Sequence, residues 1–456
     1  MKSTSLRELI FDRVKTDLND IAICHKSNDL LYSDLINLPQ KFHNKKVILF
    51  IEDTIALITA MVIFDGSVSE LCPISTSTKE EDLEHLLSLR NFDIVVSDVE
   101  KSKINLFTHK KIDYVDFAKL DLSNDENINH TTQKTTWLVP TSGTTSKPKL
   151  VEHHINSLVS TAIKKKKIRL SKTEVWGQFY DITRYAGYQV LFNSLLNGHT
   201  LVTSPYTEEI NARVEYYSKK SVSHISATPT QWRKILMSGL ANKIPLMQII
   251  LGGEAADQQI LSALRNYFPN SKITHTFAST EAGLGISVSD GLSGFPLHFL
   301  EHSEGSVDIK IHDGKLLLRS SSTALGYTDK TRLRDEEGWI DTGDLVRIEG
   351  DRFFIIGRET GIINIGGDKV NPESVRQTLL EHDMVAEAHV YGRKNPITGM
   401  LLATDIQLKS NIDNSEGKKA VKLFIREKLQ LKDQPRIINI VDTITTNLTG
   451  KISQRI

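Results

Sequence analysis

The sequence predicts an α/β protein built in three successive parts. From about residue 20 to residue 290, short β-branched runs alternate with segments of helical spacing, which is typical of mostly parallel sheets. From about Gly291 the runs become closely spaced strands separated by Gly and Asp turns, which indicates antiparallel pairing. After Arg358 a smaller unit of strands and helices follows. The 456 residues suffice for roughly two to four domains.

In the first part, apolar β-branched runs predict the strands and 3.6-residue spacing predicts the helices. Strands are expected at 20–25, 46–51, 69–75, 93–98 and 135–142, and helices at 53–66 and 80–90. The alternation continues through 199–205, 221–239, 246–268 and 272–283. The Asp/Asn-rich segment 121–133 is expected to be a surface loop.

In the later parts, two Gly-containing segments, 307–320 and 345–357, each read as a pair of antiparallel strands. The smaller C-terminal unit contains expected strands at 362–367, 387–392, 401–408 and 436–441, and helices at 371–382 and 416–429.

The composition is that of an ordinary globular protein, with 39% hydrophobic and 25% charged residues. Fifty-six basic residues balance fifty-six acidic ones, so no overall field favours nucleic acid or an anionic membrane as a partner. Two cysteines, Cys24 and Cys72, are too few for a disulfide framework or a zinc site and are expected to be buried and inert. The amphipathic segment 1–20 lacks the apolar core of a signal peptide, and no apolar run approaches ~20 residues. The protein is therefore expected to be cytoplasmic.

The most unusual stretch is TSGTTSKPK, residues 141–149, directly after an expected buried strand. Only three residues separate Gly143 from Lys147, so it is not the common nucleotide loop of Gly, four residues, then Gly-Lys-Ser/Thr. Its chemistry is nevertheless suited to phosphate: glycine permits a tight turn, hydroxyls donate hydrogen bonds and lysine supplies charge. A hydroxyl-rich surface turn is the alternative for the loop taken alone.

The loop resembles the phosphate-binding signature of the adenylate-forming enzymes: acyl-CoA synthetases, adenylation domains of nonribosomal peptide synthetases, and firefly luciferase. Further segments resemble that superfamily in the same order along almost the whole chain. They are LLYSDLINL (30–38), ALITAMVIFDGSVSELCPIS (56–75), LGGEA (251–255), FASTEAG (277–283), GWIDTGDL (338–345), IIGRETGIINIGGDKVNPESV (355–375) and LTGKISQR (448–455).

The resemblance implies a fold and a reaction. The fold is α/β, with a large N-terminal domain of two α/β subdomains plus a small β portion (1–357), and a smaller mobile C-terminal α+β domain (358–456). The reaction joins a carboxylic acid to the α-phosphate of ATP, releases pyrophosphate, and transfers the acyl group from the adenylate to a thiol. ATP and Mg²⁺ are the implied cofactors, and the thiol belongs to CoA or to the phosphopantetheine of a carrier protein.

The resemblance also assigns roles to single residues. Lys451, Glu281 and Thr280 are the implied catalytic residues: Lys451 bridges the acid and the α-phosphate, Thr280 reaches the α-phosphate, and Glu281 is the Mg²⁺ ligand. Contacts to ATP or AMP are implied for the hydroxyl loop, the segment after a buried strand, an adenine-stacking aromatic and two ribose ligands. The loop residues are Thr141, Ser142, Gly143, Thr144, Thr145 and Lys149, and the segment after the strand is Gly252, Gly253 and Glu254. Phe277 is the implied stacking aromatic, and Asp344 and Arg358 are the implied ribose ligands.

Several positions depart from the superfamily pattern. Ser146 and Leu150 replace glycines around KPK, and Ala278 replaces a glycine before the Thr-Glu pair. Asn447 replaces a threonine in the last motif, and Thr360 stands at the hinge position. Asn364 replaces a lysine that belongs to the second half-reaction, so adenylation is expected to be retained while the hinge and the thiol step are less secure.

The acyl pocket is expected between the hydroxyl loop and the Thr-Glu pair. Its aligned positions are Arg184, Tyr185, Ala186, Gln189, Ser226, Thr276, Leu284 and Gly285. Tyr185 stands where amino-acid-activating relatives place an aspartate, which argues against an α-amino acid. This small and rather polar set favours a short, polar or aromatic acid over a long fatty acid.

Gly367 aligns with the glycine that lines the pantetheine tunnel, which favours a thioester product, although a simple turn in NIGGDK is the alternative. Two other functions remain open: a luciferase-like oxygenase, which uses the same adenylate, and a non-catalytic nucleotide-binding relative. The sequence does not indicate an oligomeric state.

Overall fold

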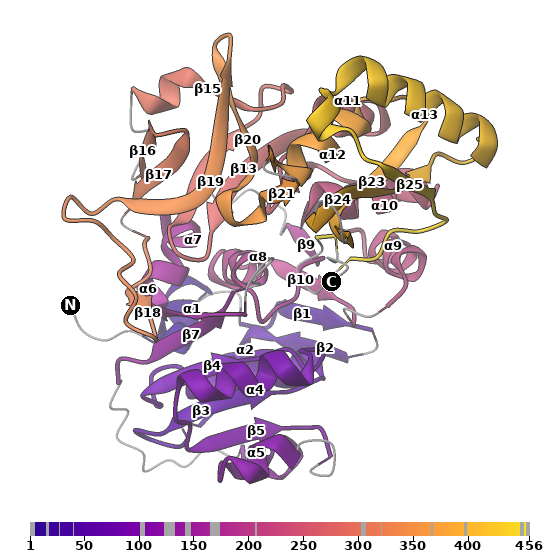
Figure 1. The fold of residues 1–456 in the computed structure, drawn as a ribbon. Helices are drawn as coiled ribbons and strands as arrows, with labels where there is room; N and C mark the ends of the chain where they lie inside the picture. Colours follow the sequence, from indigo (N-terminus) through magenta and orange to yellow (C-terminus); the bar gives the residue numbers. More distant parts are fainter. Residues whose placement is uncertain are drawn as a thin grey trace.

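The computed structural model in Figure 1 contains two large, mostly parallel sheets, an antiparallel sheet and a small C-terminal domain. It describes residues 5–14, 18–26, 28–39, 41–100, 105–122, 133–141, 147–164, 174–205, 208–301, 307–320, 322–365, 368–395, 399–446 and 451–452. The loop expected at 121–133 lies almost wholly outside these residues.

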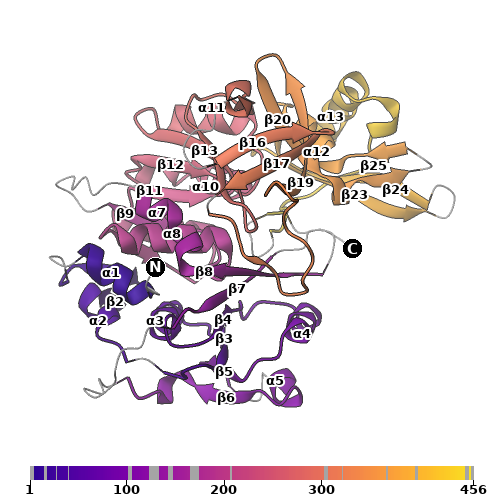
Figure 2. The same cartoon turned by 90° about the vertical axis from the view of Figure 1, so that its left-hand side faces the viewer.

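The first sheet is formed mainly by the N-terminal third of the chain. Its strands are β3 (Lys46–Phe50), β4 (Glu70–Pro73), β5 (Ile94–Ser97), β6 (Asp113–Asp116), β7 (Thr136–Pro140), β8 (Leu150–His154) and β18 (Gly326–Tyr327). They lie in the order β18-β8-β7-β4-β3-β5-β6, with β8 and β18 antiparallel and the other pairs parallel. Figure 2 shows α3 (Thr54–Phe64) and α4 (Glu80–Leu89) on opposite faces of this sheet. The segments α5 (Asn105–His109) and η2 (Phe117–Lys119) complete this part.

The second sheet has eight strands. They are β1 (Ile21–His25), β2 (Asn28–Leu31), β9 (Val175–Gln178), β10 (Thr200–Thr203), β11 (His224–Ala227), β12 (Gln248–Leu251), β13 (Lys272–Ser279) and β14 (Gly283–Val288). Their order is β14-β13-β12-β11-β9-β10-β1-β2, and only the edge pairs β1–β2 and β13–β14 are antiparallel. The accompanying helices are α1 (Leu6–Val14), α2 (Tyr32–Ile36), α6 (Ile155–Leu158), α7 (Ser160–Lys164), α8 (Tyr185–Leu196), α9 (Ile210–Lys219), α10 (Pro229–Met237), η3 (Ala241–Lys243) and α11 (Gln258–Tyr267).

One hydrophobic core joins the two parallel sheets. Helix α3 is apolar around almost its whole circumference and is buried from Leu57 to Phe64, as expected for a helix between two layers. On the first sheet, Trp137 of β7 packs edge-on against Tyr188 and Phe192 of α8, which belongs to the second sheet. Cys24 in β1 and Cys72 in β4 are both buried free thiols, as the sequence predicts.

The third sheet is antiparallel, which confirms the change of pattern after Gly291. Its strands β15 (Phe295–Pro296), β16 (Val307–His312), β17 (Lys315–Ser320), β19 (Ile340–Glu349) and β20 (Arg352–Arg358) lie in the order β15-β20-β19-β17-β16. The short helix η4 (Leu297–Leu300) follows β15.

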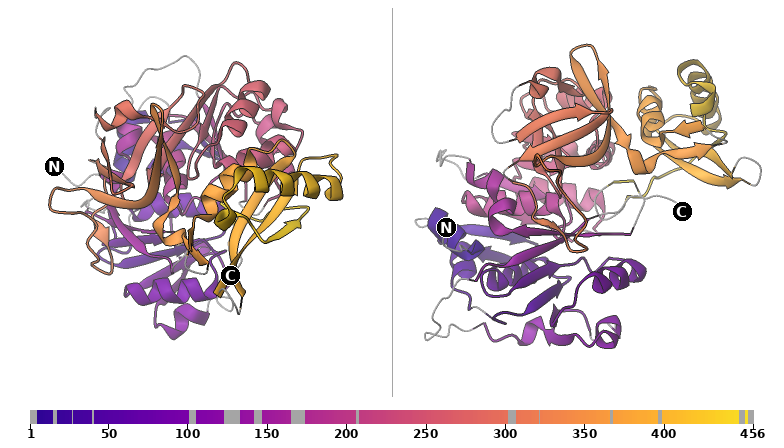
Figure 3. Two further views of the ribbon diagram at one scale, coloured as in Figure 1. Left: turned by 45° about the horizontal axis from the view of Figure 1, so that its top comes forward. Right: turned by 60° about the vertical axis from the view of Figure 1, so that its left-hand side comes forward.

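The C-terminal residues form a separate small domain with its own core, which projects to one side in Figure 3. It contains η5 (Glu359–Gly361), the hairpin of β21 (Ile363–Ile365) and β22 (Asp368–Val370), and α12 (Pro372–Leu380). A sheet of β23 (Val385–Asn395), β24 (Gly399–Leu408) and β25 (Ile437–Ile440) follows, with α13 (Asn414–Lys428) and η6 (Leu431–Asp433). The expected fold class is confirmed, whereas the exact boundary after residue 357 stays a prediction.

Buried charged side chains join the small domain to α10. Arg376 of α12 donates to the Glu387 carboxylate at 2.8 Å and to the Thr230 hydroxyl of α10 at 3.3 Å. Arg233 of α10 lies 3.7 Å from the second Glu387 oxygen and pairs with Asp257. The network therefore links the small domain to α10, the helix that follows β11. Across the described residues, we find no helix both long and apolar enough to cross a membrane.

Candidate active site

The candidate site is built from loops that follow parallel strands of the second sheet, together with the hairpin β19–β20 and the C-terminal residues. Gly252 follows β12, Ser226 lies near the end of β11, and Thr280 follows β13. Ligand sites commonly lie beyond the carboxyl ends of parallel strands, because the connecting loops gather there.

Asp344 and Arg358 face each other across the hairpin β19–β20. They are register partners, and Arg358 Nε lies 3.3 Å from Asp344 Oδ1. Asp344 is only 6% exposed, and its Oδ2 has no hydrogen-bond partner within the described chain. Burial raises the pKa of Asp344, while the charges of Arg358 and Lys451 oppose that rise. A buried carboxylate with an unused oxygen is suited to accept hydrogen bonds from a ligand's hydroxyls.

Lys451 approaches this pair from the far end of the chain. A Cβ added to Gly253 would lie 3.7 Å from Lys451 Cε, which places the lysine beside the loop after β12. Burial lowers the pKa of Lys451, as does the charge of Arg358, while Glu254 and Asp344 act in the opposite direction. The structure therefore brings Lys451, Gly253, Asp344 and Arg358 together from three separate segments, since the last two share one hairpin.

The Gly-Gly-Glu segment is held close to neighbouring backbone and side chains. A Cβ on Gly252 would lie 2.9 Å from Thr276 Oγ1, and Gly253 has a φ of +82°, which disfavours a side chain. Glu254 accepts a hydrogen bond of 3.0 Å from Thr230 N at the start of α10, and its burial raises its pKa. Tyr180 donates to Gly252 O at 3.1 Å, a contact that the sequence analysis missed.

The hydroxyl loop itself lies outside the described residues, including Ser142, Gly143, Thr144 and Thr145. Its two ends are described and are tied together. Thr141 N donates to Lys149 O at 2.8 Å, and Lys149 N donates to Thr141 Oγ1 at 3.2 Å. Gly367, the expected tunnel residue, is likewise outside the described residues.

The Thr280–Glu281 turn is fixed by two side chains that the sequence analysis missed. His153 Nε2 lies 2.8 Å from Thr280 O, to which it donates, and burial lowers the pKa of His153 to about 4. Tyr327 donates its hydroxyl to Glu281 Oε1 at 3.1 Å. No motif marks either residue, because each stands in an ordinary strand pattern and acquires its contact only through the packing of β8 and β18.

Glu281 fits a magnesium ion that is shared with a nucleotide. The described residues contain no group of three or more His, Cys, Asp or Glu side chains able to hold a metal by themselves. Mg²⁺ at nucleotide sites is commonly bound by one or two carboxylates together with phosphate oxygens, so a single glutamate is sufficient as the protein ligand.

Phe277, the expected adenine-stacking residue, lies on β13 and is partly buried against the core of the antiparallel sheet. A Cβ on Gly285 would lie 3.3 Å from Phe277 Cδ1, so the ring is close to the Gly285 backbone. Stacking of Phe277 on adenine stays a prediction.

The residues expected in the acyl pocket fall into two groups. The first is at the start of α8, where Arg184 Nη1 donates to Pro140 O at 3.1 Å and Tyr185 stacks on His153 with centroids 5.9 Å apart. Gln189 in the same helix donates to Leu158 O and accepts a hydrogen bond from the Thr161 hydroxyl, so its amide faces α6 and α7. Ala186 packs at the edge of the main core.

The second group lies around the loop after β12. Thr276 donates to Leu251 O at 3.2 Å, and Ser226 is a hydrogen-bond neighbour of Tyr180. Leu284 and Gly285 stand on β14, which pairs with β13. Thr276 lies against Gly252, and Tyr185 stacks on the histidine that holds Thr280, whereas Arg184 contacts the end of β7.

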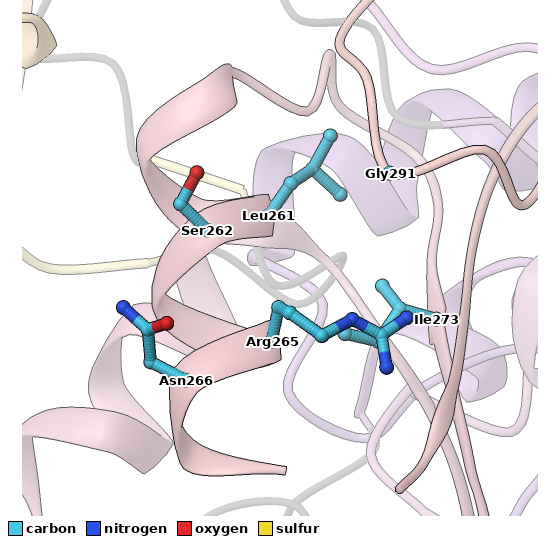
Figure 4. Close-up of a pocket in the computed structure, with 6 residues that line it drawn as sticks. All are labelled: Leu261, Ser262, Arg265, Asn266, Ile273 and Gly291. Atoms are coloured by element: carbon cyan, nitrogen blue, oxygen red, sulfur yellow. The ribbon is translucent and has the colours of Figure 1, made fainter. Parts of the chain in front are cut away.

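A shallow pocket of about 190 Å³ lies elsewhere, between α11 and the segment around Gly291 (Figure 4). Arg265 lines it but donates to the carbonyls of Pro269 and Ser271. None of the candidate site residues borders this pocket, so it is not part of the site.

Comparisons with known proteins identify the family of the chain. Residues 43–328 match the family model described as AMP-binding enzyme. A 2-succinylbenzoate–CoA ligase of Bacillus velezensis is 26% identical over 339 residues, which cover 71% of this chain and 68% of that enzyme. The o-succinylbenzoate CoA synthetase of Bacillus subtilis, solved with its acyl-adenylate intermediate, has a TM-score of 0.73 at 18% identity and covers 97% of this chain and 96% of that one.

An anthranilate CoA ligase solved with anthranoyl-AMP has a TM-score of 0.79 at 18% identity, with 99% of this chain and 96% of that chain covered. These two structural likenesses concern the fold, whereas the family match spans well over half of the sequence. The chain therefore belongs to the AMP-binding enzymes, a family of the adenylate-forming superfamily that includes the acyl-CoA synthetases.

Proposed function

We propose that this protein is an AMP-forming acid–thiol ligase that converts an aromatic or short polar carboxylic acid to its acyl-adenylate and then to its CoA thioester. The observation that carries the proposal is the convergence of Lys451, Asp344 and Arg358 beside the Gly-Gly-Glu loop. Lys451 is distant in sequence from the hairpin that carries Asp344 and Arg358, and the three residues stand at positions that resemble those used in the superfamily for attack and for ribose binding.

The chemistry of the first step follows from charge. The acid's carboxylate and the α-phosphate of ATP repel each other as they approach, so a cation near both lowers the barrier. Lys451 is that cation in the proposal, and the buried Asp344 accepts hydrogen bonds from the ribose hydroxyls. Lys149 and the hydroxyl loop bind the outer phosphates, with Glu281 as the protein ligand of Mg²⁺, which neutralises charge on the phosphates when bound.

The acid is proposed from the pocket residues and from the relatives. Tyr185 supplies aromatic surface, and Arg184 supplies a charge at the start of α8 for a polar substituent of the acid. The relatives named for 2-succinylbenzoate and anthranilate act on aromatic acids, which agrees with this choice. CoA is preferred to a carrier protein because those relatives are CoA ligases.

The two-domain arrangement belongs to the same proposal. Residues 1–357 would hold ATP and the acid, and residues 358–456 would form a lid that brings Lys451 to the site and later rotates so that Gly367 borders the thiol. Because ATP and CoA are both cytoplasmic substrates, we also propose a cytoplasmic location.

The test is pyrophosphate release across a panel of benzoates, hydroxylated short acids, α-amino acids and fatty acids, followed by thioester formation with CoA or a phosphopantetheinylated carrier protein. We expect release with aromatic or short polar acids and thioester formation with CoA. If none of the acids in the panel caused pyrophosphate release, the proposed reaction would be rejected. Thioester formation only on the carrier protein would reject the proposed acceptor.

A further inference from the structure

One tyrosine contacts both of the charged residues that the proposed function assigns to the outer phosphates and the metal. The Tyr327 hydroxyl donates to Glu281 Oε1 at 3.1 Å, and Lys149 Nζ lies 4.6 Å from the centre of the Tyr327 ring. The backbone fixes this position, because Tyr327 in β18 is the register partner of Val151 in β8. Lys149 immediately precedes β8, so the pair β8–β18 places Lys149 and Tyr327, while Glu281 lies in the turn between β13 and β14.

The tyrosine contacts two opposite charges without neutralising either. The face of an aromatic ring attracts a cation but carries no net charge, so Lys149 keeps its charge for a ligand. The hydroxyl donates to one oxygen of Glu281, which leaves the other oxygen available to a metal. Lys149 and Glu281 both lie in the part of the chain that the structure describes, and they form no ion pair within 4.0 Å with each other.

We propose that Tyr327 is a positioning residue that keeps Lys149 and Glu281 from pairing with each other and orients Glu281 toward the metal of a Mg²⁺–nucleotide complex. The inference rests on the proposed function, because it takes Lys149 as a phosphate ligand and Glu281 as a metal ligand. A direct Lys149–Glu281 pair would occupy the charges that the phosphates and the metal need.

The experiment measures how much the metal strengthens nucleotide binding. Isothermal titration of the full-length protein gives the dissociation constant of ATP in excess Mg²⁺ and in EDTA, and the ratio of the two is the metal-dependent gain. Tyr327→Phe keeps the ring but removes the hydroxyl, and we expect the gain to fall about three- to tenfold, the size of a partly lost hydrogen bond to a charged group. AMP lacks the outer phosphates, so its binding should be unchanged. Tyr327→Leu also removes the ring and should lower the gain further.

A double-mutant cycle tests whether Tyr327 acts through Glu281. Glu281→Gln should abolish most of the gain, and adding Tyr327→Phe to it should then change little. Tyr216→Phe is the matched control, because Tyr216 also combines a lysine near its ring with a hydroxyl contact. Lys220 Nζ lies 5.9 Å from the Tyr216 ring centre, and the Tyr216 hydroxyl contacts Cys24 Sγ of β1 at 3.5 Å, so neither contact involves Glu281. This control should leave the gain and AMP binding unchanged.

Three results would overturn the inference. The first is a wild-type gain in Tyr327→Phe, the second is an equal weakening of ATP and AMP, and the third is an effect of Tyr327→Phe that persists undiminished in Glu281→Gln. Failure of the proposed function gives a different result. If the protein showed the Tyr327-dependent gain but none of the acids caused pyrophosphate release, the inference would stand and the proposed reaction would be rejected.

Discussion

Asp344 offers the sharpest test of the nucleotide site, because its carboxylate is buried while one oxygen lacks a partner. Asp344→Ala would leave both ribose hydroxyls without their proposed acceptor, and a hydrogen bond to a charged group contributes about 1.5–3 kcal/mol. Arg358 would also lose its carboxylate partner, but its side chain is 45% exposed, so water can replace that contact at little cost. We therefore expect affinity to fall about ten- to a hundredfold.

The assay is direct titration with ATP, AMP and adenosine, with a thermal unfolding scan to verify folding. The three ligands share the ribose, so the same factor should appear for each. Glu349→Ala is the matched control, because Glu349 pairs with Arg347 at 2.9 Å on the same strand but is 56% exposed. Such a surface pair contributes roughly 0–1 kcal/mol and should not affect nucleotide binding. Unchanged affinity for all three ligands in Asp344→Ala would refute the ribose assignment.

Three further predictions concern the reaction and the stability. Lys451→Ala should slow acyl-adenylate formation by about 10²-fold or more while leaving thioester formation from presynthesised acyl-adenylate near the wild-type rate; equal loss in both single-turnover assays would contradict the assigned role. Gly367→Leu should spare acid-dependent ATP–pyrophosphate exchange and slow thioester formation, and joint loss of both would instead indicate misfolding. His153 has a folded pKa of about 4, below its usual value, so its neutral form stabilises the protein. In denaturant titrations, wild-type protein should therefore lose about 3 kcal/mol more stability from pH 6.5 to pH 4 than His153→Gln does, and parallel pH profiles of the two proteins would exclude this origin.

The order of strands and helices was largely predictable because local patterns encode it. The runs at β3, β4, β5 and β7 are short and β-branched, and α3 and α4 show helical spacing, so their identity follows from residues close in sequence. The sheet to which a strand belongs is not encoded in this way. Strand β1 precedes β3 in the chain yet pairs with β10 in the other sheet, a choice made by long-range packing.

The same distinction applies to the site. Asp344, Arg358 and Lys451 stand in recognisable motifs, and the structure places them together. Tyr327 escaped prediction because β18 has only two residues and derives its position from β8. Gln189 aligned with the pocket, yet hydrogen bonds to neighbouring helices turn its amide toward α6 and α7, which an alignment cannot reveal.

The hairpin that pairs Asp344 with Arg358 limits how this protein can change in length. Successive side chains along a strand point to opposite faces, so inserting one residue within the paired part of either strand would move one member of the pair to the other side of the sheet. The hairpin already contains one register shift, between Leu345 and Val346, and Asp344 is paired with Arg358 on the far side of this shift from the turn. Beyond it, the turn at Gly350 lies at the exposed tip, where length can vary without disturbing the pair. Related proteins should therefore differ in hairpin length at this tip, and loop grafts placed there should preserve nucleotide binding.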